Sequence, residues 1–349
     1  MTYTRVRLGA IGYELPPIVV SSAELEARLA PVYQALHLPL GQLEQLTGIH
    51  ERRYWEEGYP LSLGAAAAAR RALERSGVEA QDIEVLIYAG VCREQFEPAT
   101  ACRVAHELGV SRSAAIFDLS NACLGVMNGI LDVANRIELG QIRAGLVVSC
   151  EASRDIIELS IERMLESGKD LGLFTRSIAT LTGGSGAVAV LLTDGSFGEE
   201  DRPRLVGGVT ENAPEHHELC RWGVHPTETR GLRREEMATD SVAVLKNGVE
   251  LGVRTFGALL AKLGWSGQSI DRVICHQVGS AHQSTILQSL GISVEKDFAT
   301  YPFLGNIGTV SLPLTAAIAA ERRVLKHGDR VAWLGIGSGL NCLMLGWEW

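Results

Sequence analysis

The stretch AAIFDLSNACLGVMNGILDVANRIELGQIRAGLVVS, residues 114–149, decides the fold. It opens with an apolar run of strand length, continues over residues 124–139 with the apolar spacing of a helix that ends at Gly140, and closes with a second apolar run. A strand, a helix and a strand in this order are typical of parallel strands joined by a crossover helix. The sequence therefore predicts an α/β protein with parallel-type sheets between helices.

A second copy of this pattern lies in the C-terminal half. The run DIEVLIYAGV, residues 82–91, can be aligned with SIDRVICHQV, residues 269–278. The helix and strand of residues 124–149 correspond to a helix over 310–326 and the strand VAWLGIGS. Because the same elements recur in order with one local gap, we interpret the chain as an internal duplication. The alternative is that any two strand–helix units look alike.

A charged loop separates the two copies. The first half closes with the strand GAVAVLLTDG, residues 186–195, and the loop SFGEEDRPR follows. We place the boundary there, which gives halves of residues 1–195 and 196–349. Residues 153–181 have mixed helical character and no counterpart in the second half, so we interpret them as an insertion that could cover a site.

The composition disfavours several classes of function. The net charge of −9 argues against nucleic acid or an anionic membrane as a main partner, because both require a basic face. No apolar leader and no uncharged apolar stretch of about 18 residues is present, so a cytoplasmic protein without a membrane segment is expected. The seven cysteines form no C-x-x-C pair, which disfavours a disulfide framework or structural zinc.

Cys123 is the first candidate nucleophile. It lies where an apolar strand gives way to a helix. A thiol at a helix N-terminus faces unpaired N–H groups and the positive end of the helix dipole, which favour its thiolate form. The alternative is that Cys123 is a small hydrophobic residue of a buried element.

Three further polar motifs follow predicted strands. His276 follows the strand DRVIC, Asn306 lies in the loop LGNIGTVS after an expected strand KDFATYPF (residues 296–303), and the last predicted strand ends in GIGSGLN. Ligands gather at the carboxyl ends of strands in doubly wound sheets. A hydrogen-bonded core histidine and a turn-forming asparagine are the simpler explanations, but together with Cys123 these residues predict one shared site.

Cys123 in NACLG, His276 in ICHQV, Asn306 in GNIGTVS and the terminal GIGSGLN resemble the Cys-His-Asn condensing enzymes of the thiolase superfamily, in the ketoacyl-acyl-carrier-protein synthase III branch. The similarity covers nearly the whole chain, including TGIHERRYW, residues 47–55. The chain differs from fatty-acid starter synthases where Gln-Val-Gly-Ser follows His276 and Ile-Gly follows Asn306. These differences, with EPAT at residues 97–100, are similar to OleA-type enzymes, which join two fatty acyl-CoA molecules head to head.

The resemblance implies a thiolase-like fold, in which two duplicated βαβαβ halves form a layered α-β-α-β-α sandwich, and a homodimer. It implies that Cys123 carries the acyl group, that the backbone N–H groups of Cys123 and Ser338 form an oxyanion hole, and that His276 and Asn306 donate hydrogen bonds to an enolate oxygen. It also implies that Glu97 reaches the site from the neighbouring subunit.

A base is required on physical grounds if two ordinary acyl thioesters are joined. A malonyl thioester yields its carbanion by losing carbon dioxide, whereas an ordinary acyl thioester must lose a weakly acidic α-proton to a positioned base. The resemblance gives Glu97 this role. The alternative is a solvated glutamate in a charged surface cluster.

Other features give weaker signals. Arg52, Arg53 and Trp55 could meet the phosphates and adenine of CoA, although a charged surface run explains them equally well. GIGSG lacks the following glycine and helix of a dinucleotide site. Three histidines and a cysteine match no zinc spacing: His216, His217, Cys220 and His225. We expect neither a metal nor a permanently bound cofactor.

The sequence thus predicts an acyltransferase that condenses two fatty acyl-CoA thioesters without decarboxylation to a β-ketoacyl product through an acyl-Cys123 intermediate. Two alternatives stay open. One is a decarboxylative 3-oxoacyl synthase that uses acyl-CoA and malonyl-acyl-carrier protein. The other is a non-catalytic acyl-binding subunit of a heteromeric synthase. A cysteine peptidase would also use Cys, His and Asn, but the duplicated pattern and the context of Cys123 speak against it.

Overall fold

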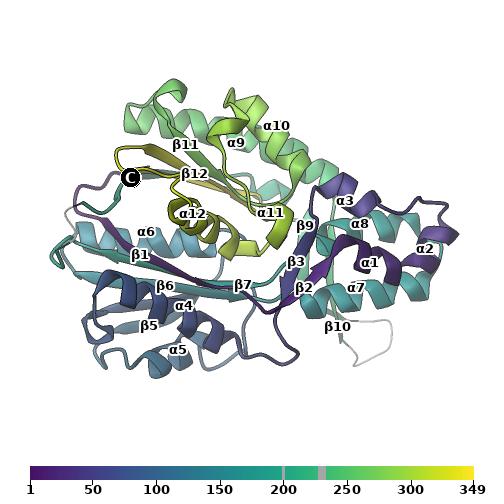
Figure 1. Cartoon of the computed structure of the whole chain (residues 1–349), viewed down its shortest axis with the longest axis horizontal. Coiled ribbons are helices and arrows are strands. Elements are labelled where there is room, and N and C mark those ends of the chain that lie inside the picture. The colour runs from purple at the N-terminus through teal and green to yellow at the C-terminus, as the bar shows by residue number, and fades with distance from the viewer. Residues whose placement is uncertain (199–200, 227–232) are drawn as a thin grey trace.

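The computed structural model describes residues 1–198, 201–226 and 233–349. Its main sheet has the strand order β11-β12-β13-β8-β1-β7-β6-β4-β5. The single residue pair Arg7–Arg204 joins β1 to β8, so the sheet consists of two parts (Figure 1). The strands of the main sheet are β1 (Arg7–Glu14), β4 (Val85–Ala89), β5 (Ala115–Leu119), β6 (Ala144–Glu151), β7 (Gly186–Thr193), β8 (Arg204–Asn212), β11 (Arg272–Cys275), β12 (Arg330–Gly337) and β13 (Asn341–Glu348).

The two parts of the sheet share a four-strand topology, in which β4-β6-β7-β1 corresponds to β11-β12-β13-β8, and β5 has no counterpart among the described strands. In the first part the order is β5-β4-β6-β7-β1, and in the second it is β11-β12-β13-β8. The helices are α1 (Ser22–Arg28), α2 (Ala30–Ala35), α3 (Gln42–Thr47), α4 (Leu61–Ser76), α5 (Thr100–Leu108), α6 (Gly125–Glu138), α7 (Arg154–Ser167), α8 (Leu171–Leu181), α9 (Ser241–Leu263), α10 (Ser280–Leu290), α11 (Tyr301–Leu304) and α12 (Ser311–Glu321). Two antiparallel strand pairs complete the described strands: β2 (Ile18–Ser21) with β3 (Glu51–Tyr54), and β9 (Cys220–Pro226) with β10 (Arg233–Thr239).

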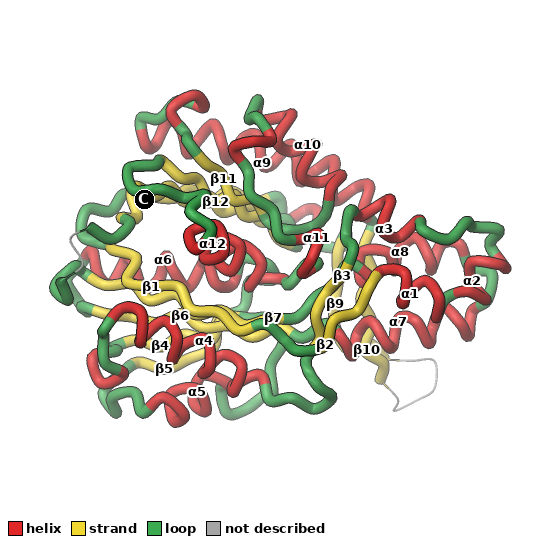
Figure 2. The backbone as a smooth tube through the Cα atoms, in the orientation of Figure 1, coloured by secondary structure: helices red, strands yellow, loops and turns green. Residues whose placement is uncertain are grey.

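Three of the four hydrophobic cores found among the described residues lie between five layers of helices and sheet. The central core holds residues of α6 and α12, such as Ile130 and Leu314, between the two parts of the sheet. A second core packs α4 and α5 on the outer face of the first part, and a third packs α9 and α10 on the outer face of the second. Neighbours along β6 point to opposite cores: Val147 faces the central core and Leu146 the second. The predicted α-β-α-β-α sandwich is confirmed (Figures 1 and 2).

The alanine-rich helix α4 lies very close to strand β1. A Cβ atom added to Gly12 would lie only 2.1 Å from the carbonyl oxygen of Ala68. The small residues of the alanine run therefore allow a helix-to-strand contact that larger side chains would prevent.

The expectation of parallel-type sheets is only partly correct. β4 pairs in parallel with β5 and β6, and β11 with β12, whereas β7, β1, β13 and β8 join their neighbours antiparallel. The sequence analysis expected β12 to be the last strand, but β13 follows it after a short turn. A turn this short can connect only antiparallel neighbours.

The strand expected over residues 296–303 is wrong. Only Asp297 makes an isolated bridge, to Val273, and residues from Tyr301 onward form α11. The side chain of Gln277 accepts hydrogen bonds from the backbone N–H groups of Thr300 (2.8 Å) and Tyr301 (3.1 Å), and Pro302 has no N–H. The donors that a strand would have used are therefore engaged or missing.

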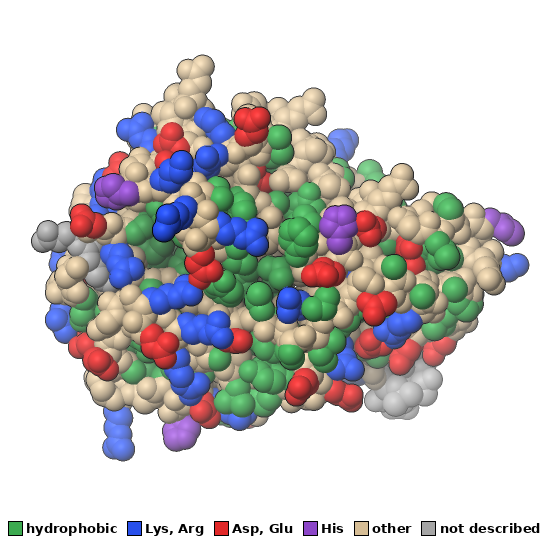
Figure 3. Space-filling model, in the orientation of Figure 1, with side chains coloured by type: hydrophobic (Ala, Val, Ile, Leu, Met, Phe, Trp, Pro, Cys, Tyr) green, Lys and Arg blue, Asp and Glu red, His purple; other side chains and the backbone are tan. Residues whose placement is uncertain are grey.

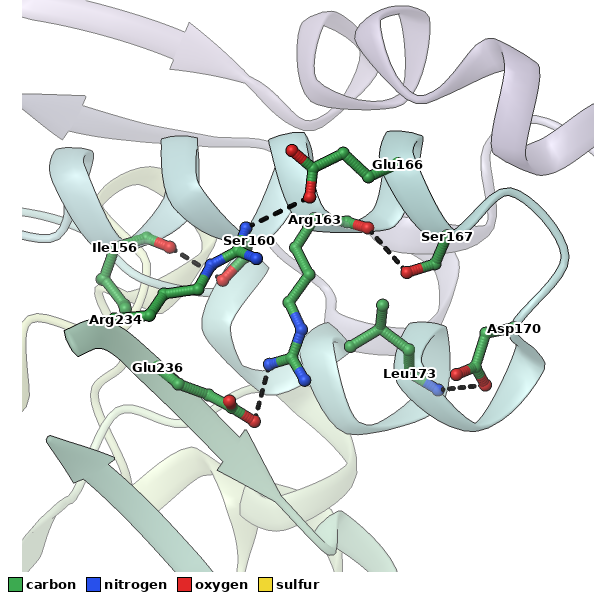
Figure 4. A network of polar contacts seen from close by, with 9 residues as sticks. All are labelled: Ile156, Ser160, Arg163, Glu166, Ser167, Asp170, Leu173, Arg234 and Glu236. Atoms are coloured by element: carbon green, nitrogen blue, oxygen red, sulfur yellow. Dashed lines mark hydrogen bonds and ion pairs between the residues drawn. The ribbon is translucent and has the colours of Figure 1, made fainter. Parts of the chain in front are cut away.

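Residues 153–181, interpreted as an insertion, form α7 and α8. Arg163 on α7 pairs with Glu236 on β10 at 2.6 Å, and Glu166 with Arg234 at 3.5 Å (Figure 4). These ion pairs join the insertion to the β9–β10 pair, which the sequence analysis did not foresee. The boundary placed at residue 195 falls between β7 and β8.

The visible surface in Figure 3 carries Lys and Arg interspersed with Asp and Glu. Within the described ranges, we find no helix with the length and apolar character needed to span a bilayer.

Candidate active site

One large cavity lies between the two halves. Its volume is about 980 Å³, and its walls are mainly apolar. Cys123, His276 and Asn306 all line it, together with Ser338. Leu46 and Val242 also line the cavity and are 53% and 78% exposed, so they mark where it reaches the surface.

Cys123 follows β5 and directly precedes Leu124, the N-cap of α6. The turn is strained: Ala122 has a φ of 44°, a left-handed conformation that a residue with a Cβ rarely adopts. This turn places the half-buried Cys123 at the cavity wall rather than in the central core.

The expectation that the position of Cys123 favours its thiolate form is wrong, because the pKa of its thiol is raised. Burial, and to a smaller extent the neighbouring Cys220 and Glu151, raise the pKa of the Cys123 thiol to about 12. In addition, one of the backbone N–H groups at the start of α6 already has a hydrogen-bond partner, because the Val126 N–H donates to Thr309 Oγ1 at 2.7 Å. Desolvation outweighs the helix dipole here.

His276 follows β11, and its backbone N–H donates to the Leu334 carbonyl at 3.0 Å. Burial, and then the neighbouring His282, lower the pKa of His276 to about 4. The imidazole is therefore neutral at pH 7, with one ring N–H available as a hydrogen-bond donor.

Asn306 is fixed by its backbone and by its side chain. Its N–H donates to the Thr182 carbonyl at 2.9 Å, and its own carbonyl accepts from the Gly184 N–H at 2.9 Å. Its side-chain Oδ1 accepts from the Gly308 N–H at 3.0 Å. Because Oδ1 is engaged, the Nδ2 amide is the group left to donate into the cavity.

The glycine-rich end of β12 packs against the turn that carries Cys123. A Cβ added to Gly337 would lie 3.5 Å from the Cys123 nitrogen, and one added to Gly335 would lie 2.5 Å from the sulfur of Met127. Ser338 follows directly and lines the cavity. The glycines therefore allow β12 to approach the Cys123 turn closely.

Glu151 is a cavity residue that the sequence analysis missed. It ends β6 and is 4% exposed. Burial raises the pKa of its carboxyl group. An acidic residue at the end of an apolar strand was the available signal, since Cys123 and His276 also follow strands.

Glu97 does not line the cavity of this chain. It is exposed on the loop of residues 91–99 between β4 and α5, next to Phe96, which is 100% exposed. The structure thus brings Cys123, His276 and Asn306 together and leaves Glu97 outside.

Comparison with known proteins agrees with this geometry. Residues 56–160 match the thiolase N-terminal domain, and residues 260–349 match the C-terminal domain of 3-oxoacyl-[acyl-carrier-protein (ACP)] synthase III. The chain is 53% identical to an acyl-CoA:acyl-CoA alkyltransferase of Shewanella oneidensis and 35% identical to one of Xanthomonas campestris pv. campestris, and each alignment covers 100% of both chains.

The chain belongs to the OleA-type family of acyl-CoA:acyl-CoA alkyltransferases. It is similar to the crystal structure of Xanthomonas campestris OleA bound to cerulenin, with a TM-score of 0.94, 36% identity and coverage of 100% of this chain and 98% of that one. A structure of that OleA with bound lauric acid and lauroyl-CoA matches with a TM-score of 0.92 at 35% identity, over 99% and 100% of the two chains. The predicted family membership, thiolase-like fold and acyltransferase class are confirmed.

The structure does not support the CoA contacts predicted for Arg52, Arg53 and Trp55, because these side chains are buried or half-buried outside the cavity. Arg52 is 0% exposed, and its guanidinium donates to the Leu181 carbonyl at 3.2 Å. Trp55 is 5% exposed and stacks on Tyr59. Arg53 is half-buried and donates to the Pro16 carbonyl at 3.2 Å. None of the three lines the cavity.

The histidines near β9 do not assemble into a cluster. His216 and His217 lie at η2 (Pro214–His216) and just after it, whereas Cys220 and His225 lie on β9 and line the cavity. In the parts of the chain that the structure describes, no group of three or more His, Cys, Asp or Glu side chains could hold a metal ion.

Proposed function

We propose that this chain condenses two fatty acyl-CoA thioesters, without decarboxylation, to a β-ketoacyl product through an acyl-Cys123 intermediate. One observation carries the proposal: Cys123, His276 and Asn306 meet at a single, mainly apolar cavity in a chain that is 53% identical over its full length to an acyl-CoA:acyl-CoA alkyltransferase. In this proposal the half with residues 1–195 supplies the nucleophile, and the half with residues 196–349 supplies His276 and Asn306.

The first half-reaction transfers an acyl group. The Cys123 sulfur attacks the thioester carbonyl of one acyl-CoA, and the backbone N–H groups of Cys123 and Ser338 stabilise the oxyanion. The C–S bond to CoA breaks, and the proton from Cys123 leaves with the CoA thiol. Because burial raises the pKa of the Cys123 thiol, the thiol loses its proton as the sulfur attacks the thioester in this proposal.

The second half-reaction forms the carbon–carbon bond. Glu97 of the partner subunit removes an α-proton from a second acyl-CoA, and the neutral His276 and the Asn306 amide donate hydrogen bonds to the enolate oxygen. The α-carbon attacks the acyl-Cys123 carbonyl, the C–S bond breaks, and the sulfur regains a proton. The exposure of Glu97 and Phe96 supports a dimer, because aromatic side chains are enriched at interfaces.

The test is incubation with one saturated long-chain acyl-CoA and no malonyl donor, followed by mass spectrometry. The expected products are the coupled β-keto acid or its decarboxylated ketone. Product formation only when malonyl thioester is supplied, with release of carbon dioxide, would show a decarboxylative synthase instead. Coupling by Cys123→Ala would exclude the covalent scheme.

A second test separates the two half-reactions. Glu97→Gln is expected to abolish coupling while acyl-Cys123 still accumulates, because a carboxamide cannot accept the α-proton. Unchanged coupling would show that Glu97 is a surface residue.

A further inference from the structure

The loop of residues 91–99, which carries Glu97, is held at both ends by carboxylates. At its start, the Glu151 carboxylate accepts hydrogen bonds from the backbone N–H groups of Val91 at 2.9 Å and Cys92 at 3.1 Å. Just beyond its end, Asp118 accepts from the N–H groups of Thr100 and Ala101, both at 2.9 Å. Charge-assisted hydrogen bonds of this kind are stronger and more directional than neutral ones.

Glu151 is a buried carboxylate at the wall of the cavity. It is 4% exposed, and among the described residues no Lys or Arg contributes to the shift of its pKa. Burial raises the pKa of its carboxyl group, so the environment disfavours the charge. The hydrogen bonds that it accepts come from the loop that carries Glu97.

The tip of the loop is exposed, whereas Glu94 before it accepts hydrogen bonds from Ser62 on α4. Gln95, Phe96, Glu97 and Pro98 are all exposed, and residues 93–99 do not line the protomer's own cavity. A loop with fixed ends and an exposed tip suits the presentation of a group to a second molecule, because the fixed ends limit how far the tip can wander.

We propose that Glu151 and Asp118 are positioning residues that fix the loop of residues 91–99, and with it Glu97, for the active site of the partner subunit. The inference rests on the proposed function, in which Glu97 acts across the dimer. Its distinctive consequence is that Glu151 lines one cavity but serves the reaction in the other.

The first experiment compares single variants as homodimers. Glu151→Gln keeps the shape of the side chain but turns an amide donor toward one of the two backbone N–H groups. Coupling is expected to fall by about 100-fold, the scale of a misplacement of reacting groups by about 1 Å, while acyl-Cys123 still forms and accumulates. Asp118→Asn, at the other end of the loop, is likewise expected to lower coupling while acyl-Cys123 still forms. Wild-type coupling in both variants would overturn the proposal.

Glu138→Gln is the matched control. Glu138 also accepts hydrogen bonds from two consecutive backbone N–H groups, those of Thr4 and Arg5, and it lies outside the cavity and the loop. It should leave coupling unchanged. A similar loss in this variant would show that any broken backbone anchor lowers activity, and would overturn a specific role for Glu151.

The deciding experiment uses mixed dimers, co-expressed with two affinity tags. One subunit carries Cys123→Ala, which has an intact loop but no nucleophile, and the other carries Glu151→Gln. If Glu151 acts through the loop on the partner, the Cys123 of the second subunit receives an intact loop. The mixed dimer should then recover about half of the wild-type coupling rate, since one of its two sites is complete.

A parallel mixed dimer of Cys123→Ala with Glu97→Gln separates this inference from the proposed function. Failure of that pair to recover activity would show that Glu97 does not act across the dimer. Recovery there, combined with no recovery in the Glu151 pair, would show that Glu151 acts in its own cavity and would overturn only the present proposal. The Asp118→Asn pair repeats the comparison if Glu151→Gln prevents acylation.

Discussion

At the scale of single residues, the chemistry depends on how each polar group is oriented and desolvated. Asn306 shows the first effect: engaging Oδ1 with the Gly308 N–H leaves Nδ2 as the donor. Cys123 shows the second, since burial raises the pKa of its thiol although it lies at the start of a helix. The sequence identified both residues, but it could not show the balance between dipole and desolvation, because that balance depends on neighbours such as Cys220 that are distant in sequence.

The first residue-scale prediction concerns Asn306→Asp. The carboxylate keeps an acceptor for the Gly308 N–H but removes the donor and adds a charge beside the enolate oxygen. Coupling should fall by about 100- to 1,000-fold, as for loss of an oxyanion donor, whereas acylation of Cys123 should be much less affected. Product analysis and mass spectrometry of the acyl-enzyme measure the two steps; an equal loss in both would contradict the proposed role.

The second residue-scale prediction concerns the reactivity of free Cys123. A thiol pKa of about 12 leaves a small thiolate fraction at neutral pH, and that fraction grows as the pH rises. The alkylation rate of Cys123 should therefore increase by about tenfold per pH unit from pH 7 to pH 10. Peptide mass spectrometry follows the modification, with unfolded protein as the control. A rate that levels off below pH 9 would show that the thiol is activated in the free enzyme.

At the scale of elements, the sequence predicted the positions of the buried strands and of α6 and α12 well, because long apolar runs report burial directly. The prediction failed where a side chain, and not a neighbouring strand, accepts the hydrogen bonds of the backbone N–H groups. Residues 296–303 have strand-like composition, yet Gln277 binds their N–H groups and α11 forms instead. The β9–β10 pair was also missed, since its contacts are with α7 and α8, which are distant in sequence.

The element-scale prediction concerns α9, whose inner face lines the cavity. A Cβ added to Gly248 would lie 2.9 Å from Ile336 Cδ1, so any side chain there must narrow the space. Gly248→Val should lower coupling of long acyl-CoA substrates more than that of short ones. Gly257→Ala on the same helix is the control, because nothing lies within 4 Å of its added Cβ. A chain-length profile that is equal in both variants would show that α9 does not border an acyl chain.

At the scale of the whole molecule, the site exists only where the two halves meet. Cys123 comes from the first half, and His276 and Asn306 come from the second. Hydrogen bonds join the halves there. The Thr309 hydroxyl oxygen accepts from the Val126 N–H at the start of α6, and the Gly184 N–H donates to the Asn306 carbonyl. The duplication in the sequence foretold that strand ends would converge, but the hydrogen bonds between the halves could be seen only in the fold.

Stability should also depend on pH through a group of the second half that lies beside the site. Asp297 accepts hydrogen bonds from Gln283 and from the N–H of Cys275, the residue before His276. Burial raises the pKa of Asp297 from 3.8 to about 6. Between these values the native state binds more protons than the unfolded state, so the free energy of unfolding falls as the pH rises from about 4 to 6.

The variant Asp297→Asn removes this titration, and its side-chain oxygen can still accept a hydrogen bond from the Cys275 N–H. Relative to the wild type, the variant should gain at most about 3 kcal/mol between pH 4 and pH 7, at 1.36 kcal/mol per pKa unit. Urea unfolding at several pH values measures the difference, and a difference that does not change with pH would show that Asp297 titrates alike in both states.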